Sequence, residues 1–221
     1  MKNILIHGLG QNSKDWDTIK NELETRGISP IVPDLFDLTK GRELDYPTVY
    51  QAFSELCESY KDKLNLCGLS LGGLLALNYA IQYPKKINSL VLIGTPFEIP
   101  KGLLKFQNFV FKLIPKSAFQ SMGVSKKDFI RLSKSMAELN FMESAATLDC
   151  PTLILCGAKD KTNMESAKRF HEAMKNSKLV IVEDSGHEVN KDNPRKLVSI
   201  LQDFWAVSYT HLRAHETSQD L

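Results

Sequence analysis

The chain has 221 residues, of which 43% are hydrophobic and 24% are charged, and these fractions are typical of a soluble globular domain of ordinary to large size. Its 28 basic and 26 acidic residues are spread without long runs of one sign, which argues against nucleic acid or an anionic membrane as the main partner. We find no apolar stretch of membrane-spanning length and no signal peptide, so we expect a cytoplasmic protein.

Short apolar runs alternate with amphipathic segments along the chain. The runs are almost continuously hydrophobic, which suits parallel strands that are covered on both faces. Their alternation with helical patterns implies right-handed crossovers. We therefore predict an α/β fold with a doubly wound, mostly parallel sheet of about six strands. The predicted strands are residues 3–6, 30–33, 64–67, 89–93, 152–156 and 179–182.

The first predicted strand, residues 3–6, leads into the loop HGLGQNSKDW at residues 7–16. Gly8 and Gly10 bring this loop close to the G-x-G-x-x-G pattern that binds a dinucleotide, but Ser13 stands where the third glycine belongs. The same loop also fits a second interpretation, in which its backbone amides face a developing oxyanion. The loop alone does not decide between the two.

The strand predicted at residues 64–67 continues into GLSLGG, a G-x-S-x-G motif between a strand and an apolar helix. So tight a turn forces Ser70 into a strained backbone conformation and leaves no space for side chains at Gly68 and Gly72. It also places the Ser70 hydroxyl at a helix N-terminus, where the Leu71 amide and the helix dipole favour negative charge. The alternative is that Ser70 merely caps the helix.

A nucleophilic serine needs a base and an acid, and in this architecture the acid precedes the histidine in the chain. Asp160 follows the strand at residues 152–156 and lies 90 residues after Ser70, while His187 follows the strand at 179–182 and lies 27 residues further on. Carboxyl ends of parallel strands meet at one sheet edge, so we expect the three to converge. Weaker candidates for the acid are Asp184, Glu98 and Asp149.

Other histidines receive structural roles. His7 precedes the glycines of the first loop and is expected to brace that loop. His171 shares a helix face with Ala167 and Phe170, so we expect it to be partly buried.

Residues 97–148 contain no predicted strand and are rich in aromatic and aliphatic residues. So long an excursion between two strands favours a helical lid over the site, although two helices that extend the core would give the same pattern. The α/β core then comprises residues 1–96 and 149–207. Residues 208–221 lack apolar periodicity and follow a helix that is predicted to end at Trp205, and we interpret them as a non-native tail.

Together, HGLG, GLSLGG, GAKD and SGH resemble the motifs of the α/β-hydrolase superfamily, in particular its small serine esterases, over residues 1 to about 205. The resemblance implies a role for five residues: Ser70 as nucleophile, Asp160 as acid, His187 as general base, and Leu9 and Leu71 as amide donors of an oxyanion hole.

The resulting expectation is hydrolysis of a carboxylic ester or thioester through an acyl-enzyme. The apolar segment at residues 97–148 favours a small-molecule substrate with an apolar acyl group. Such chemistry requires no cofactor, and the four cysteines lack metal-ligand spacing. The same triad in lyase or perhydrolase chemistry and a non-catalytic scaffold stay open as alternatives. A nucleotide-dependent oxidoreductase is disfavoured because it leaves GLSLGG unexplained.

Overall fold

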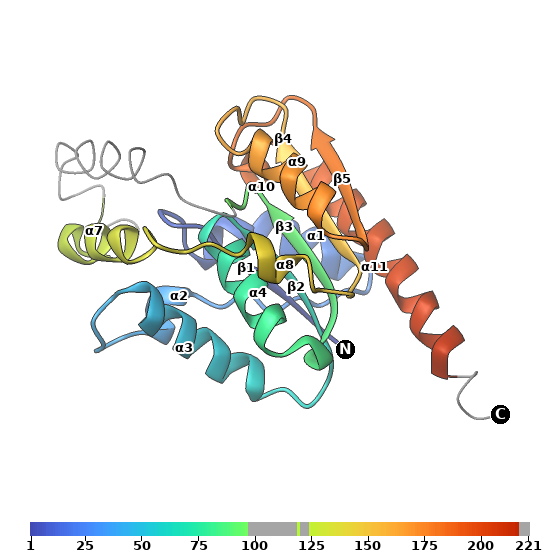
Figure 1. Ribbon diagram of the computed structural model, residues 1–221, viewed down its shortest axis with the longest axis horizontal. Coiled ribbons are helices and arrows are strands. Elements are labelled where there is room, and N and C mark those ends of the chain that lie inside the picture. The colour runs from blue at the N-terminus through green and yellow to red at the C-terminus, as the bar shows by residue number, and fades with distance from the viewer. Residues whose placement is uncertain (97–118, 120–123, 217–221) are drawn as a thin grey trace.

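The centre of the fold is a sheet of five parallel strands in the order β1-β2-β3-β4-β5 (Figure 1). The computed structural model describes residues 1–96, 119 and 124–216, with side chains to residue 206. Each strand pairs with its neighbours in the sequence, so all carboxyl ends meet at one edge. The strands are β1 (Lys2–Ile6), β2 (Leu64–Leu69), β3 (Ile87–Ile93), β4 (Thr152–Gly157) and β5 (Ser177–Val182).

Capping chemistry sets several of the helix boundaries. Asp45 accepts a hydrogen bond from the Thr48 amide at 2.9 Å, and Ser125 accepts one from the Asp128 amide at 3.1 Å. Each bond satisfies an amide that has no partner inside the helix. The helical segments are η1 (Ser13–Trp16), α1 (Asp17–Thr25), α2 (Leu35–Leu38), α3 (Tyr46–Glu58), α4 (Leu71–Gln82), η2 (Pro84–Lys86), α7 (Lys126–Ser135), α8 (Met142–Ala145), α9 (Met164–Ala173), α10 (Val189–Asp192) and α11 (Pro194–Glu216).

Helices cover both faces of the sheet because alternate strand residues point to opposite sides. On one face Ile4 and Ile6 of β1 share a core with residues of α3, α4 and α9. On the other face Leu5 packs with residues of α1 and α11. In Figure 1, α4 lies in front of the sheet and α1 behind it. The predicted doubly wound parallel sheet is therefore confirmed.

The predicted strand at residues 30–33 does not form, and the sheet has five strands rather than about six. Ile31 alone bridges to β1: its amide donates to the Asn3 carbonyl at 2.8 Å, and its carbonyl accepts from the Leu5 amide at 2.9 Å. Alternate residues of a strand bond to one neighbour, so Pro33 is the next residue that would donate to β1. Proline has no N–H, and the ladder stops there.

Half of the segment predicted as a lid, residues 97–118 and 120–123, lies outside the described residues. The remaining part contains α7 and α8, and its Phe129 and Leu132 are buried in the same core as α3 and α4. Its α7 is bonded to the first residue of α3, since the Ser135 hydroxyl accepts from the Tyr46 amide at 2.7 Å. This part of the insertion thus extends the core.

The prediction that the last helix ends at Trp205 is wrong. The backbone of α11 stays helical to Glu216, and residues 206–216 contain neither glycine nor proline to end it. That residues 208–221 are a non-native tail stays a prediction. Although α11 has 23 residues, no helix in the described part of the chain is both long and apolar enough to cross a membrane.

Candidate active site

Ser70 occupies a strained turn between β2 and α4. Its backbone angles are φ 52° and ψ −110°, outside the regions that a residue with a side chain normally adopts. Two hydrogen bonds hold it there: its amide donates to the Ile93 carbonyl at 2.9 Å, and its carbonyl accepts from the Leu74 amide at 3.0 Å. The hydroxyl does not cap α4. The alternative of a plain helix cap is therefore excluded.

The glycines on either side of Ser70 are required by close backbone contacts. A Cβ at Gly68 would overlap the backbone of Gly72, and a Cβ at Gly72 would overlap the carbonyl of Ile6. Both collisions involve main-chain atoms, which cannot turn aside as a side chain can. The predicted need for glycine at these two positions is confirmed.

Asp160 and His187 meet at the carboxyl ends of β4 and β5. His187 Nδ1 lies 2.8 Å from Asp160 Oδ2. The two loops also contact through backbone, since the Lys159 amide donates to the Ser185 carbonyl at 2.9 Å. The Asp160 side chain is buried, whereas that of His187 is 41% exposed. One side of the imidazole is thus held by the acid, and the ring remains accessible.

The hydrogen bonds to Asp160 keep its carboxyl ionised. Burial by itself acts to raise the pKa of Asp160, but hydrogen bonds from His187 and Asn163 outweigh that effect and lower the pKa below its ordinary value. The ionised Asp160 accepts a hydrogen bond from His187 Nδ1–H, so in the neutral ring Nε2 carries no proton. That nitrogen is the one that can act as a base.

Gly94 lies between Ser70 and the Asp160–His187 pair. It follows Ile93, whose carbonyl binds the Ser70 amide, and a Cβ on Gly94 would be only 2.9 Å from His187 Nδ1. All three predicted residues therefore lie at one sheet edge. The structure brings Asp160 and His187 into direct contact, while none of the hydrogen bonds among the described side chains joins the Ser70 hydroxyl to His187.

Leu9 and Leu71, the two expected amide donors, come from different elements that approach Ser70. Leu71 is the first residue of α4, and Leu9 lies in the loop after β1, where a Cβ at Gly8 would be 3.5 Å from Ser70 Cβ. Within the described part of the chain, neither amide donates a hydrogen bond. Two N–H groups with no internal partner next to one hydroxyl are what a developing oxyanion requires.

Comparison with known proteins shows which family has this fold. The family described as alpha/beta hydrolase fold matches residues 4–120. The chain belongs to that family. Lipase 3 of Moraxella sp. (strain TA144) is 28% identical over 224 residues, which cover 83% of this chain and 70% of that protein. Pimeloyl-[acyl-carrier protein] methyl ester esterase of Aeromonas hydrophila subsp. hydrophila is 24% identical over 239 residues, or 91% of this chain and 94% of that protein.

Solved structures agree with the family. The esterase EaEST from Exiguobacterium antarcticum superposes with a TM-score of 0.80 at 21% identity, covering 92% of this chain and 91% of that one. This likeness shows the shared hydrolase fold.

His7 braces the first loop of this hydrolase fold, as predicted. Its Nε2 accepts from the Leu35 amide at 3.0 Å, so Nδ1 carries the proton and donates to the Gly8 carbonyl at 3.0 Å. Burial lowers the pKa of His7, mainly because the charged ring would lose its hydration. The neutral ring therefore fixes the backbone immediately before Leu9.

Gln11 was missed by the sequence reasoning, although it ties the first loop to the segment after His187. The buried Gln11 amide donates to Glu188 Oε1 at 2.8 Å and to Asn190 Oδ1 at 3.2 Å, and it accepts from Asn190 Nδ2 at 3.3 Å. No motif or residue spacing predicts that a glutamine will make such long-range bonds. The only hint in the sequence is that Gln11 is a polar residue between a strand and a helix of the hydrolase fold.

The other candidate residues do not join the site. Asp184 is exposed and pairs with Lys159 at 3.5 Å, and Asp149 lies at the far edge of the sheet. Glu98 lies outside the described residues. His171 is exposed on α9, not partly buried as predicted, because it lies at the end of that helix next to Ser177. Nowhere in residues 1–96, 119 and 124–206, whose side chains are described, do three His, Cys, Asp or Glu side chains gather as metal ligands.

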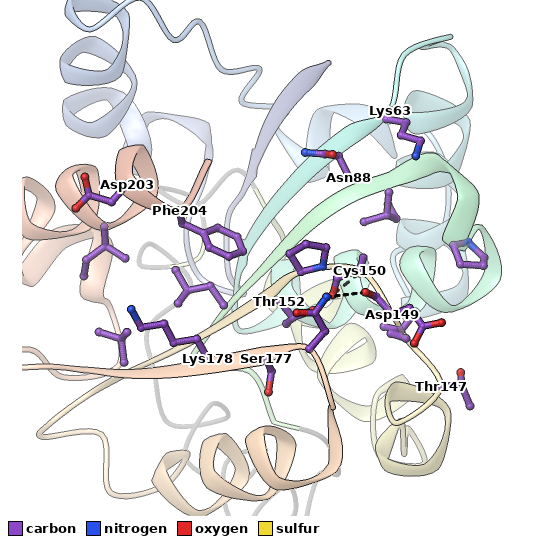
Figure 2. A pocket seen from close by; sticks show the side chains of 18 residues that line it. Lys63, Asn88, Thr147, Asp149, Cys150, Thr152, Ser177, Lys178, Asp203 and Phe204 are labelled. Atoms are coloured by element: carbon purple, nitrogen blue, oxygen red, sulfur yellow. Dashed lines mark hydrogen bonds between the residues drawn. The ribbon is translucent and has the colours of Figure 1, made fainter. Parts of the chain in front are cut away.

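A cavity of about 910 Å³ lies at the opposite, amino edge of the sheet (Figure 2). Asn88, Thr152 and Ser177, near the starts of β3, β4 and β5, line one side, and Phe204 of α11 lies across from them. Neither Ser70 nor His187 borders it. The cavity is therefore separate from the candidate active site, and the chemistry belongs to the carboxyl edge.

Proposed function

We propose that the chain is a serine esterase that hydrolyses a carboxylic ester or thioester through an acyl-enzyme. One observation carries the proposal: Ser70 sits in a strained turn at the sheet edge where Asp160 contacts His187, and among the described residues the amides of Leu9 and Leu71 have no hydrogen-bond acceptor. Family membership supports it, and so do relatives named as a lipase and a methyl ester esterase.

The first half of the reaction is acylation. His187 Nε2 removes the Ser70 proton as the hydroxyl oxygen attacks the carbonyl carbon, and Asp160 stabilises the imidazolium that forms. The amides of Leu9 and Leu71 bind the oxyanion, and removal of one such donor costs about 3 kcal/mol in comparable sites. The imidazolium then protonates the leaving alcohol or thiol.

Water completes the cycle. His187 removes a proton from water, the hydroxide attacks the acyl-enzyme, and the acid leaves as Ser70 recovers its proton. Every group in these steps is supplied by the chain or by water. An apolar acyl group is our expectation for the substrate, because residues 97–148 are rich in aromatic and aliphatic side chains.

A panel of p-nitrophenyl esters and thioesters of increasing acyl length tests the proposal. Ser70→Ala is expected to lower kcat by about 10³-fold or more. Ser59→Ala, at the exposed end of α3, is the matched control and is expected to retain the wild-type rate. Hydrolysis that survives in Ser70→Ala would exclude Ser70 as nucleophile.

A fluorophosphonate probe separates the alternatives. Labelling of Ser70 without hydrolysis of any ester would favour the same triad in lyase or perhydrolase chemistry. No labelling at all, in a folded protein, would favour a non-catalytic scaffold.

A further inference from the structure

Asn163 occupies the N-cap of α9 but does not cap it. Asparagine at this position usually accepts a hydrogen bond from an amide of the first helical turn, which stabilises the helix. Here the Asn163 side chain makes no such bond. The Asn163 side chain is buried and turns back toward the preceding loop, so its hydrogen bonds are made to that loop and not to the helix.

The side chain binds the acid of the proposed triad. Asn163 Nδ2 lies 2.9 Å from Asp160 Oδ2 and 3.0 Å from Asp160 Oδ1, and the Asn163 backbone amide donates to Oδ1 at 3.2 Å. The same Nδ2 is 3.1 Å from His187 Nδ1. Two donors, one from Asn163 and one from His187, therefore share Asp160 Oδ2.

The orientation of the amide follows from the charge beside it. A flipped amide would bring the Asn163 carbonyl oxygen against the ionised Asp160 carboxylate, and two acceptors would repel each other. With Nδ2 facing the carboxylate, the Asn163 N–H and the His187 Nδ1–H both point at oxygen. Neither donor can turn without losing its bond to Asp160.

We propose that Asn163 is a positioning residue, which holds the Asp160 carboxylate with Oδ2 toward His187 and takes up part of the negative charge that would otherwise act on the imidazole alone. This inference rests on the proposed function. Its consequence is chemical: the imidazolium is stabilised less than by a carboxylate with no second donor. Removal of the Asn163 donor would therefore strengthen the attraction between the Asp160 carboxylate and the imidazolium.

The other charged side chains on the neighbouring segments have partners of their own. Glu188 pairs with Lys191 at 3.2 Å, and Lys159 pairs with Asp184 at 3.5 Å. Asp192 accepts from the Gly186 amide at 2.7 Å. These groups stay the same in any variant of Asn163, so they cannot produce a difference between variants.

The test compares Asn163→Leu and Asn163→Asp with the wild type in the full chain. The matched control is Asn176→Leu, which removes an amide that donates to the Asp149 carbonyl at 2.9 Å at the far edge of the sheet. For each protein, kcat/KM toward a short p-nitrophenyl ester is measured against pH. The His187 ring signal, assigned by its loss in His187→Gln, is titrated by NMR.

In Asn163→Leu we expect the acid limb of kcat/KM to move up by about one pH unit, with KM nearly unchanged. Asn163→Asp should move it further, because a second carboxylate then faces the pair. The NMR midpoint of His187 should move in the same order, and Asn176→Leu should move neither.

Identical NMR midpoints in the wild type and both Asn163 variants would overturn the positioning role. Should Asn163→Leu fail to fold, Asn163→Ala removes the same donor with a smaller side chain and takes its place. Hydrolysis that survives Ser70→Ala would refute the proposed function, while the NMR titration would still decide whether Asn163 acts on His187.

Discussion

Gly94 offers a direct test of how closely the site is packed. Its φ of 52° lies in the left-handed region, and a Cβ there would be 2.9 Å from His187 Nδ1 and 3.3 Å from Asp160 Oδ2. Gly94→Ala therefore has two effects, backbone strain and a collision with the imidazole. Gly27→Ala has only the first, because Gly27 has φ 78° and nothing within 4 Å of its Cβ position.

The two variants should share a loss of stability and differ in activity. An alanine in the left-handed region costs about 1 to 2 kcal/mol, so both should unfold at lower urea concentration than the wild type. Only Gly94→Ala must displace His187, and a misplacement near 1 Å costs about 100-fold in rate. We expect Gly27→Ala to keep the wild-type kcat and Gly94→Ala to lose about 100-fold.

The assays are urea unfolding followed by fluorescence and p-nitrophenyl ester turnover under conditions where both variants are folded. If Gly94→Ala turned over ester as fast as Gly27→Ala, the imidazole would not need the position seen here. Close packing of His187 against Gly94 would then have no effect on catalysis.

Two further predictions concern the acid and the first loop. Because the folded-state pKa of Asp160 lies below its ordinary value, the ionised carboxylate stabilises the fold above the unfolded-state pKa, and this contribution is lost as the pH falls through the folded-state pKa. Asp160→Asn should therefore be less stable than the wild type at neutral pH, with a gap in urea midpoint that shrinks below about pH 4; a constant gap would contradict this. Gln11→Leu removes the bonds to Glu188 and Asn190 and should cost about 2 kcal/mol of unfolding free energy and lower kcat; unchanged stability would show that these bonds contribute nothing.

Patterns that depend on backbone geometry could be predicted from the sequence. Apolar runs between helical segments gave the parallel sheet, and GLSLGG gave the strained turn, because glycine spacing reports directly on main-chain contacts. The positions of Asp160 and His187 after their strands were enough to bring both to one edge. In each case a regular element carries the residue to its place.

Features that depend on side-chain contacts or on short segments were not predictable. The run at residues 30–33 looked like a strand, but Pro33 stands where the next donor to β1 is needed. Asn163 and Gln11 were missed because an amide can cap, bond across a loop or face water at any spacing. His171 was predicted to be partly buried because it shares a helix face with apolar residues. It is exposed because it lies near the end of α9, where the core no longer covers the helix. The cytoplasmic location stays a prediction.

The bonds from Gln11 to Glu188 and Asn190 join residues 177 and 179 positions apart in the chain. Contacts between residues so far apart in the chain form late in folding, because the entropy of closing a long loop is lost before the contact contributes any favourable free energy. A chain still emerging from the ribosome carries Ser70 long before it has made His187. Ester turnover during synthesis or refolding should therefore lag behind the appearance of helical signal, and the lag measures how long the final strand and helix take to dock.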